Sequence, residues 1–126
     1  MEQDNKTALV VDDDGGIRYL LSLRLISAGY MVYEAANGRE ALEQMGNHSV
    51  DVVVTDYHMP EMNGFGFLSV CRAMWPGTPV VFFSGEQDDV AHEAVDRGAF
   101  AWVRKESEFT MLLEVLDHAI HQSAHA

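Results

Sequence analysis

The feature that most constrains the fold is a strict alternation between short apolar runs and longer segments with helical spacing. The five short runs are rich in β-branched and aromatic residues, and several are continuously apolar, as strands buried on both faces should be. They cover residues 7–11, 31–35, 50–55, 79–83 and 101–103. After each run, apolar residues recur three and four positions apart, which is typical of helices. This order predicts an α/β domain in which helices cover both faces of a parallel sheet.

Turn-forming residues separate these segments. Gly29 and Gly98 follow the first and fourth helical segments, Asn37-Gly38 precedes the second, and Pro76-Gly77 follows the third. The 126 residues are enough for one compact domain with a buried core. We therefore predict a single domain over residues 1–126, with its core at about residues 7–122.

Composition narrows the expected environment and partners. No apolar run is long enough to cross a bilayer, and the polar start differs from a signal peptide, so we expect a cytoplasmic protein that contacts no membrane. The single cysteine, Cys71, cannot form an internal disulfide, which fits a reducing compartment. The net charge of −12 argues against direct nucleic-acid binding and favours divalent cations or basic partners.

Polar residues follow the predicted strands where a parallel sheet binds its ligands, beyond the carboxyl ends of the strands. Clustered carboxylates repel one another unless a cation neutralises them, and Mg²⁺ is a natural oxygen-ligated choice. An acceptor oxygen, a metal and a positive group are also the parts that phosphoryl transfer needs. The residues at these strand ends are Asp12, Asp13, Asp14, Asp56, Ser84 and Lys105.

Several motifs in order resemble the receiver domains of two-component response regulators, over nearly the whole chain from about Thr7. The most specific segment is VVTDYHMPEMNG at residues 53–64, which is similar to the acceptor strand and its following loop. LVVDD at residues 9–13 is similar to the acidic pair, and ANGREAL at residues 36–42 to the second strand–helix turn. FSG at residues 83–85, and Gly98-Ala99 leading to Trp102 and Lys105, fit the last two strands.

The resemblance implies a fold and a function. The fold is a flavodoxin-like, doubly wound sheet of five parallel strands in the order 2-1-3-4-5, with five helices. The function is that of a phospho-accepting signalling switch rather than a turnover enzyme. Asp56 would take a phosphoryl group from a phosphohistidine on a sensor histidine kinase or a phosphotransfer protein. The downstream target stays open, as does the choice between a stand-alone protein and part of a longer one.

The same resemblance assigns roles to individual residues. Asp13 and Asp56 would bind Mg²⁺ directly together with the backbone carbonyl of His58, while Asp12 would act mainly through water. Lys105 would pair with the phosphoryl oxygens. Ser84 would turn to hydrogen-bond the phosphoryl group.

Trp102 would then follow inward. This change would remodel the face formed by the fourth helix, the fifth strand and the fifth helix.

Two positions depart from the family's usual pattern. Glu106 follows Lys105 where a proline with a cis bond is usual, and a cis bond before a non-proline costs roughly 3–4 kcal/mol, which indicates a trans bond here. Trp102 stands where tyrosine or phenylalanine is typical. Because an indole is bulkier, we expect Trp102 to stay turned outward more of the time and to contact a partner.

Three other readings remain open at this point. A phosphohydrolase of the haloacid-dehalogenase type would use Asp12 as nucleophile with Asp14 nearby, but Gly16 and the unexplained segment at residues 56–64 count against it. A flavin-binding module would need a phosphate loop where the chain has three aspartates. A degenerate receiver would serve only as a binding module. Asp14 alone could simply cap the first helix.

Overall fold

The computed structural model describes residues 6–85 and 88–124, so both ends of the predicted domain lie outside the described residues. Strands and helices alternate through this range as predicted. The strands are β1 (Lys6–Val11), β2 (Tyr30–Ala35), β3 (Val52–Thr55), β4 (Val80–Ser84) and β5 (Ala101–Arg104). The helices are α1 (Gly15–Ser27), α2 (Gly38–Asn47), α3 (Gly64–Met74), α4 (Asp88–Asp96) and α5 (Phe109–Ala124). Among the described residues, no helix is both long enough and apolar enough to span a membrane.

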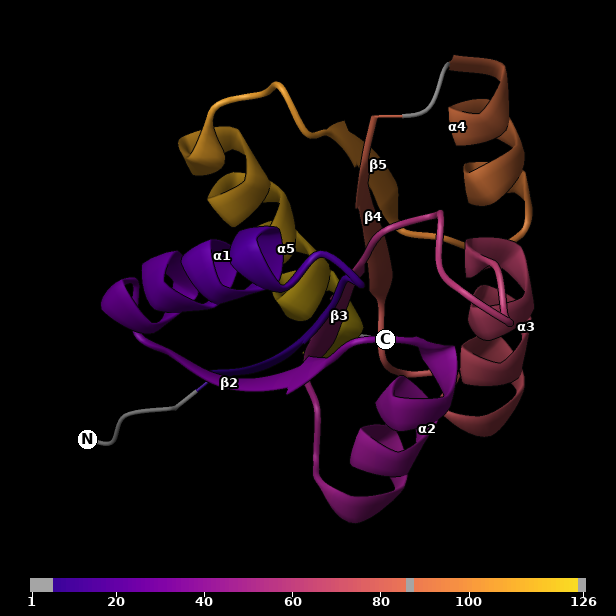
Figure 1. The fold of residues 1–126 in the computed structure, drawn as a ribbon, viewed down its shortest axis with the longest axis horizontal. Coiled ribbons are helices and arrows are strands. Elements are labelled where there is room, and N and C mark those ends of the chain that lie inside the picture. Colours follow the sequence, from indigo (N-terminus) through magenta and orange to yellow (C-terminus); the bar gives the residue numbers. More distant parts are fainter. Residues whose placement is uncertain (1–5, 86–87, 125–126) are drawn as a thin grey trace.

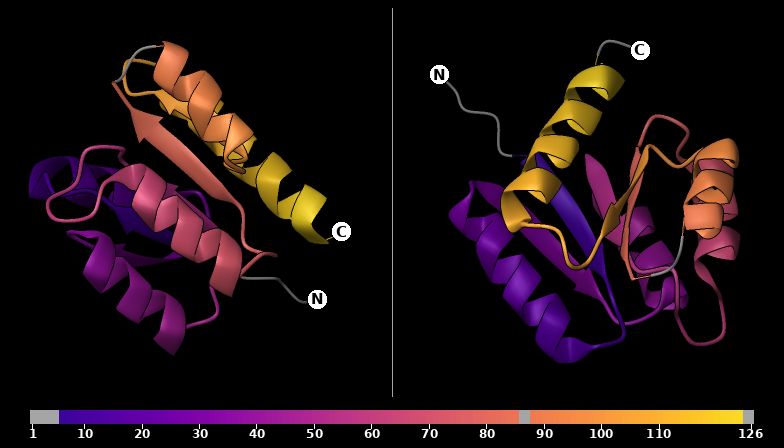
Figure 2. Two further views of the ribbon diagram at one scale, coloured as in Figure 1. Left: turned by 90° about the vertical axis from the view of Figure 1, so that its right-hand side faces the viewer. Right: turned by 90° about the horizontal axis from the view of Figure 1, so that it is seen from above.

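The strands form one parallel sheet in the order β2-β1-β3-β4-β5, which confirms the predicted fold. Helices α1 and α5 cover one face and α2, α3 and α4 cover the other (Figure 1), and the view from above shows the sheet between these two layers (Figure 2). Neighbouring residues of β1 serve different cores. Leu9 belongs to the cluster that includes Phe67, whereas Val10 belongs to the cluster that includes Leu112. A strand with a core on each face must be apolar at every position, which explains the continuous apolar runs.

The third strand begins at Val52, two residues later than the pattern indicates. Asp51 is bonded to the start of β1 instead. Its carboxylate accepts a hydrogen bond from the Thr7 N–H at 2.8 Å, and its own N–H donates to the Thr7 carbonyl at 2.9 Å. The Asp51 side chain thus hydrogen-bonds main chain just before β3 begins. A pattern of apolar residues does not reveal such a bond.

Short polar side chains begin the first three helices. The Asp14 carboxylate accepts hydrogen bonds from the Gly16 and Ile17 amides at 3.0 and 3.2 Å, so Asp14 is the N-cap of α1. Asn37 and Asn63 cap α2 and α3 in the same way. A capping side chain satisfies amide groups that have no partner within the helix. These caps set where each helix begins after its strand.

Gly64 allows the loop after β3 to pack tightly against the sheet. A Cβ atom at this position would lie 2.6 Å from the Phe82 ring and 2.9 Å from the Tyr57 Cα atom. The Gly64 N–H also donates to the Tyr57 carbonyl at 2.8 Å, which holds the loop against the start of α3. The close approach therefore fixes the segment that directly follows Asp56.

We expect Gly64→Ala to lower the free energy of unfolding by about 1–3 kcal/mol, because the new methyl group would overlap backbone and a buried ring. The matched control is Gly66→Ala in the same helical turn, where the nearest atom to a Cβ is 3.5 Å away. That change should be neutral or stabilising, since alanine favours helix by about 1 kcal/mol over glycine. Urea denaturation of both variants measures the difference, and equal stabilities would contradict this packing.

Candidate functional site

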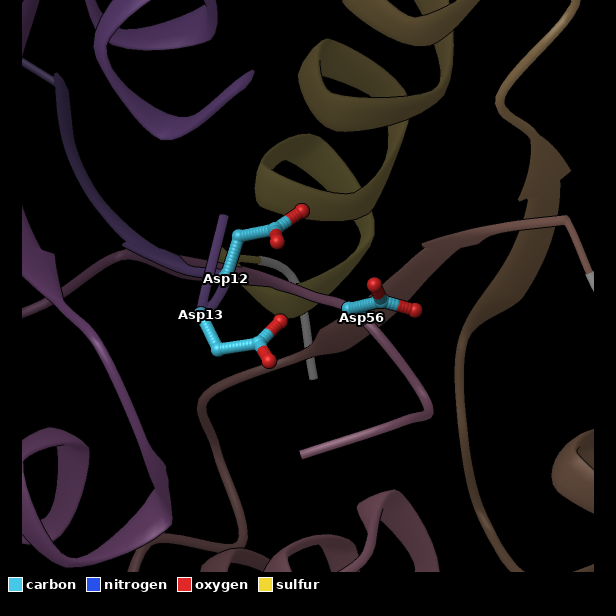
Figure 3. A group of neighbouring side chains, drawn as sticks. All are labelled: Asp12, Asp13 and Asp56. Carbon is cyan, nitrogen blue, oxygen red and sulfur yellow. The ribbon is translucent and has the colours of Figure 1, made fainter. Parts of the chain in front are cut away.

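Three carboxylates meet at the carboxyl edge of the sheet. Asp12 and Asp13 follow β1, and Asp56 follows the neighbouring strand β3. One carboxylate oxygen from each lies within 4.8 Å of the others, and Figure 3 shows the Asp12 and Asp13 side chains extending toward the side where Asp56 lies. Asp12 and Asp56 are buried, with exposed fractions of 3% and 9%, whereas Asp13 is exposed. The structure thus brings together three of the residues that the sequence placed at strand ends.

Lys105 bridges two of these carboxylates. Its Nζ atom lies 2.8 Å from Asp56 Oδ2 and 3.1 Å from Asp12 Oδ2. Its backbone N–H donates to the Ser84 carbonyl at 3.1 Å, which anchors the residue to the end of β4. Burial on its own would lower the pKa of Lys105, but the hydrogen bonds to Asp56 and Asp12, together with the negative charges of these two carboxylates, outweigh it and hold the pKa above its usual value.

The environment of Asp12 disfavours the negative charge of its carboxylate. Burial raises the pKa of the Asp12 carboxyl, and this effect is only partly offset by the Asp14 N–H, which donates to Asp12 Oδ1 at 2.9 Å, and by Lys105. The adjacent Asp56 charge raises the Asp12 pKa further. A buried carboxylate whose pKa is raised in this way gains from any added cation.

Backbone groups fix the Asp56 carboxylate. Its Oδ1 atom accepts hydrogen bonds from the N–H groups of Tyr57 at 2.7 Å and His58 at 3.3 Å. Its own N–H donates to the Val11 carbonyl at 3.0 Å, which ties the end of β3 to the end of β1. One carboxylate oxygen is therefore held by the main chain, and the other faces the Lys105 ammonium.

The donor set fits a hard divalent cation. All three side chains offer carboxylate oxygens, which are the ligands Mg²⁺ prefers. Within the described ranges, the Asp13 carboxylate has neither a hydrogen-bond nor an ion-pair partner, so it is available as a ligand. His58 lies beside the group, with its N–H on Asp56, and the predicted role of its carbonyl stays a prediction.

Ser84 and Trp102 lie on the far side of the acidic group, on β4 and β5. Ser84 ends β4 and is 1% exposed. The Trp102 ring stacks on Phe82 with centroids 5.2 Å apart and lies 5.9 Å from the Tyr57 ring. The indole is half-buried and packs against these two rings, which offer it an aromatic surface. That Trp102 stays turned outward more of the time and contacts a partner stays a prediction. The Lys105–Glu106 bond is trans, like the other peptide bonds of the described segments.

Arg18 also belongs to this region, although it was not among the predicted site residues. Its Nη1 atom donates to the Asp12 carbonyl at 2.7 Å, and its Nε atom pairs with Glu34 Oε1 at 3.0 Å. In the sequence, Arg18 looks like an ordinary charge on the exposed face of a helix. Only the packing of α1 beside β2 brings Glu34 within reach of it, so the apolar pattern contains no signal for this contact.

The chain is similar to known proteins in both sequence and fold. The family model described as "Response regulator receiver domain" matches residues 8–117. The transcriptional regulatory protein GlrR of Escherichia coli is 37% identical over 94% of this chain, and the DNA-binding transcriptional regulator NtrC of the same organism is 33% identical over 88% of it. The chain spans 27% and 24% of the lengths of these two relatives. A receiver domain protein from Clostridium thermocellum superposes with a TM-score of 0.89 at 30% identity, covering 94% of this chain and 97% of that one.

We expect Mg²⁺ to stabilise the folded protein through the acidic group. At a concentration about ten times the Kd, binding adds about 1.4 kcal/mol, which raises the Tm by several degrees. The variant Asp13→Asn should lose most of this rise. The control Asp14→Asn removes the same charge but keeps the helix cap, since asparagine caps as well as aspartate, so it should retain the rise. Thermal denaturation with Mg²⁺ and with EDTA distinguishes the two, and the reverse pattern would exclude Asp13 as a ligand.

Proposed function

The chain belongs to the response regulator receiver domain family, and on that premise we propose that Asp56 is the residue that accepts the phosphoryl group. Domains of this family are phospho-accepting switches of two-component signalling, and histidine kinases phosphorylate them. The observation that carries the proposal is the central place of Asp56 in the sheet. The strand on one side brings Asp12 and Asp13, the strand on the other brings Ser84, and Lys105 reaches Asp56 from β5.

The proposed chemistry is attack of an Asp56 carboxylate oxygen on the phosphorus of a phosphohistidine. The new O–P bond forms as the P–N bond breaks, and the imidazole of the donor leaves. The backbone N–H groups on Oδ1 keep the carboxylate in one orientation, which lowers the entropic part of the barrier. Lys105 already lies 2.8 Å from Oδ2 and is placed to pair with the phosphoryl oxygens.

Mg²⁺ is the proposed cofactor. Asp13 and Asp56 would hold the ion directly with the His58 carbonyl, and Asp12 mainly through water. When bound, the ion supplies positive charge that offsets the carboxylates and the phosphoryl oxygens. The fit rests on the grouping of three carboxylates and on the Asp13 side chain, which has no partner among residues 6–85 and 88–124.

Ser84 and Trp102 are the proposed switch residues. Ser84 would hydrogen-bond the phosphoryl group, and Trp102 would move with it, so that the face formed by α4, β5 and α5 reports the state to a target. The sheet register supports this pairing of roles. Trp102 on β5 lies opposite Phe82 on β4, and Phe82 is two residues before Ser84. The downstream target is left open.

The donor would be a sensor histidine kinase or a phosphotransfer protein, and residues 1–126 would form one cytoplasmic receiver domain without turnover activity of its own. The expectation of no nucleic-acid contact is limited to these residues, on the ground of their net charge of −12. DNA binding is named for NtrC, a protein of which this chain matches 24%, so a longer protein containing this chain could have that output.

The phosphohydrolase alternative is not favoured. It needs the second aspartate of the Asp12-x-Asp14 pair in the catalytic group, yet the Asp14 carboxylate is occupied by two amides of α1. The flavin alternative is not favoured either, since a phosphate would meet three clustered carboxylates.

Incubation with acetyl phosphate tests the proposed acceptor. We expect one phosphoryl adduct per chain by intact-mass spectrometry, formed with Mg²⁺ and not with EDTA, and absent from Asp56→Asn. The variant Asp14→Asn is the control, because it changes the charge by the same amount and should still be modified. An adduct that persists in Asp56→Asn and is lost in Asp12→Asn would show that the acceptor is Asp12.

A further inference from the structure

We infer that Arg18 is a positioning residue for the acidic pair and that it acts through the main-chain carbonyl of Asp12. The inference rests on the proposed metal site and adds to it a residue outside the ligand set. It concerns how the protein places Asp13, the exposed member of the group.

The Arg18 side chain connects three parts of the fold. From the first turn of α1, its Nη1 atom donates to the Asp12 carbonyl at 2.7 Å. Its Nε atom pairs at 3.0 Å with Glu34, whose backbone is held in the sheet opposite Val10. The Arg18 side chain is only 23% exposed, and its bond to the Asp12 carbonyl is partly buried, whereas its contact with Glu34 is exposed. The planar guanidinium thus holds a loop carbonyl and a strand carboxylate in one fixed arrangement.

The carbonyl of Asp12 matters because it belongs to the same peptide plane as the Asp13 N–H. Rotation about the Cα–C bond of Asp12 would turn that plane and carry the Asp13 Cα atom and side chain with it. Asp12 has other anchors, since its N–H donates to Ala35 and its Oδ1 accepts from Asp14. The Asp13 carboxylate has no partner of its own within the described ranges, so its direction depends on the backbone that Arg18 holds.

Charge alone predicts the opposite role for Arg18. A guanidinium beside a cation site repels the cation, and its removal should strengthen binding. Here Glu34 pairs with Arg18 and largely cancels that charge, which leaves the hydrogen bond to the carbonyl as the main effect. If repulsion dominates, removal of Arg18 strengthens Mg²⁺ binding. If the hydrogen bond to the Asp12 carbonyl dominates, removal of Arg18 weakens it.

The test is a Mg²⁺ titration of the amide resonances, comparing Arg18→Met with the matched control Arg39→Met. Arg39 lies exposed on α2, so the control removes the same charge away from the Asp12 carbonyl. We expect the Kd of Arg18→Met to rise about tenfold, as is usual when a partner of a metal ligand is removed, and the Kd of the control to stay level or fall. Without metal, the Asp13 amide should shift in Arg18→Met and not in the control.

The variant Arg18→Lys keeps the charge but replaces the planar guanidinium with one ammonium on a flexible stem, so its Kd should lie between those of the unaltered protein and Arg18→Met. An unchanged or tighter Kd in Arg18→Met, with its fold intact by circular dichroism, would overturn the inference while leaving the metal site in place. If Arg18→Met fails to fold, the inference is overturned by an Arg18→Lys variant whose Kd for Mg²⁺ equals that of the unaltered protein. A failure of the unaltered protein to bind Mg²⁺ would overturn the metal site and the inference together.

Discussion

The bridge from Lys105 to Asp56 and Asp12 is the interaction on which the rest of the site depends. Carboxylates this close repel one another, and two of them are almost fully buried, so the positive charge of Lys105 stabilises the group. Lys105 comes from β5, two strands from β3, and its side chain must cross that distance. The bond from its N–H to the Ser84 carbonyl makes this possible, because it fixes where the side chain starts. The end of β4 therefore sets the position from which the Lys105 side chain reaches the acidic group.

Much of this arrangement could be predicted from the sequence, for a physical reason. A parallel sheet with helices on both faces requires continuous apolar strands, so the strands are conspicuous and the residues after them are easy to find. The strand order came from the family resemblance, since periodicity does not specify which strands are neighbours. Three consecutive aspartates also look alike in the sequence. Only the start of α1 separates them, by taking Asp14 as its cap.

The contacts that the sequence did not predict are those between elements. Arg18 and Glu34 lie on α1 and β2, and their pairing depends on how the helix packs beside the edge strand. The half-buried Trp102 ring packs on Phe82 and Tyr57, and the sequence pattern did not indicate these two residues as its neighbours. In each case the deciding partner is distant in sequence and becomes a neighbour only through the order of strands.

The two sides of the acidic group differ in how firmly they are held. On the β1 side, Asp12 is bonded through its N–H, its carbonyl and both carboxylate oxygens, so little can move there. On the β5 side, the Trp102 indole N–H is buried and has no hydrogen-bond partner within the described ranges. A buried donor without a partner costs about 1–3 kcal/mol, the same size as typical coupling free energies between sites. A rearrangement that gave the Trp102 indole N–H a partner would recover this cost, whereas Asp12 has no such cost to recover.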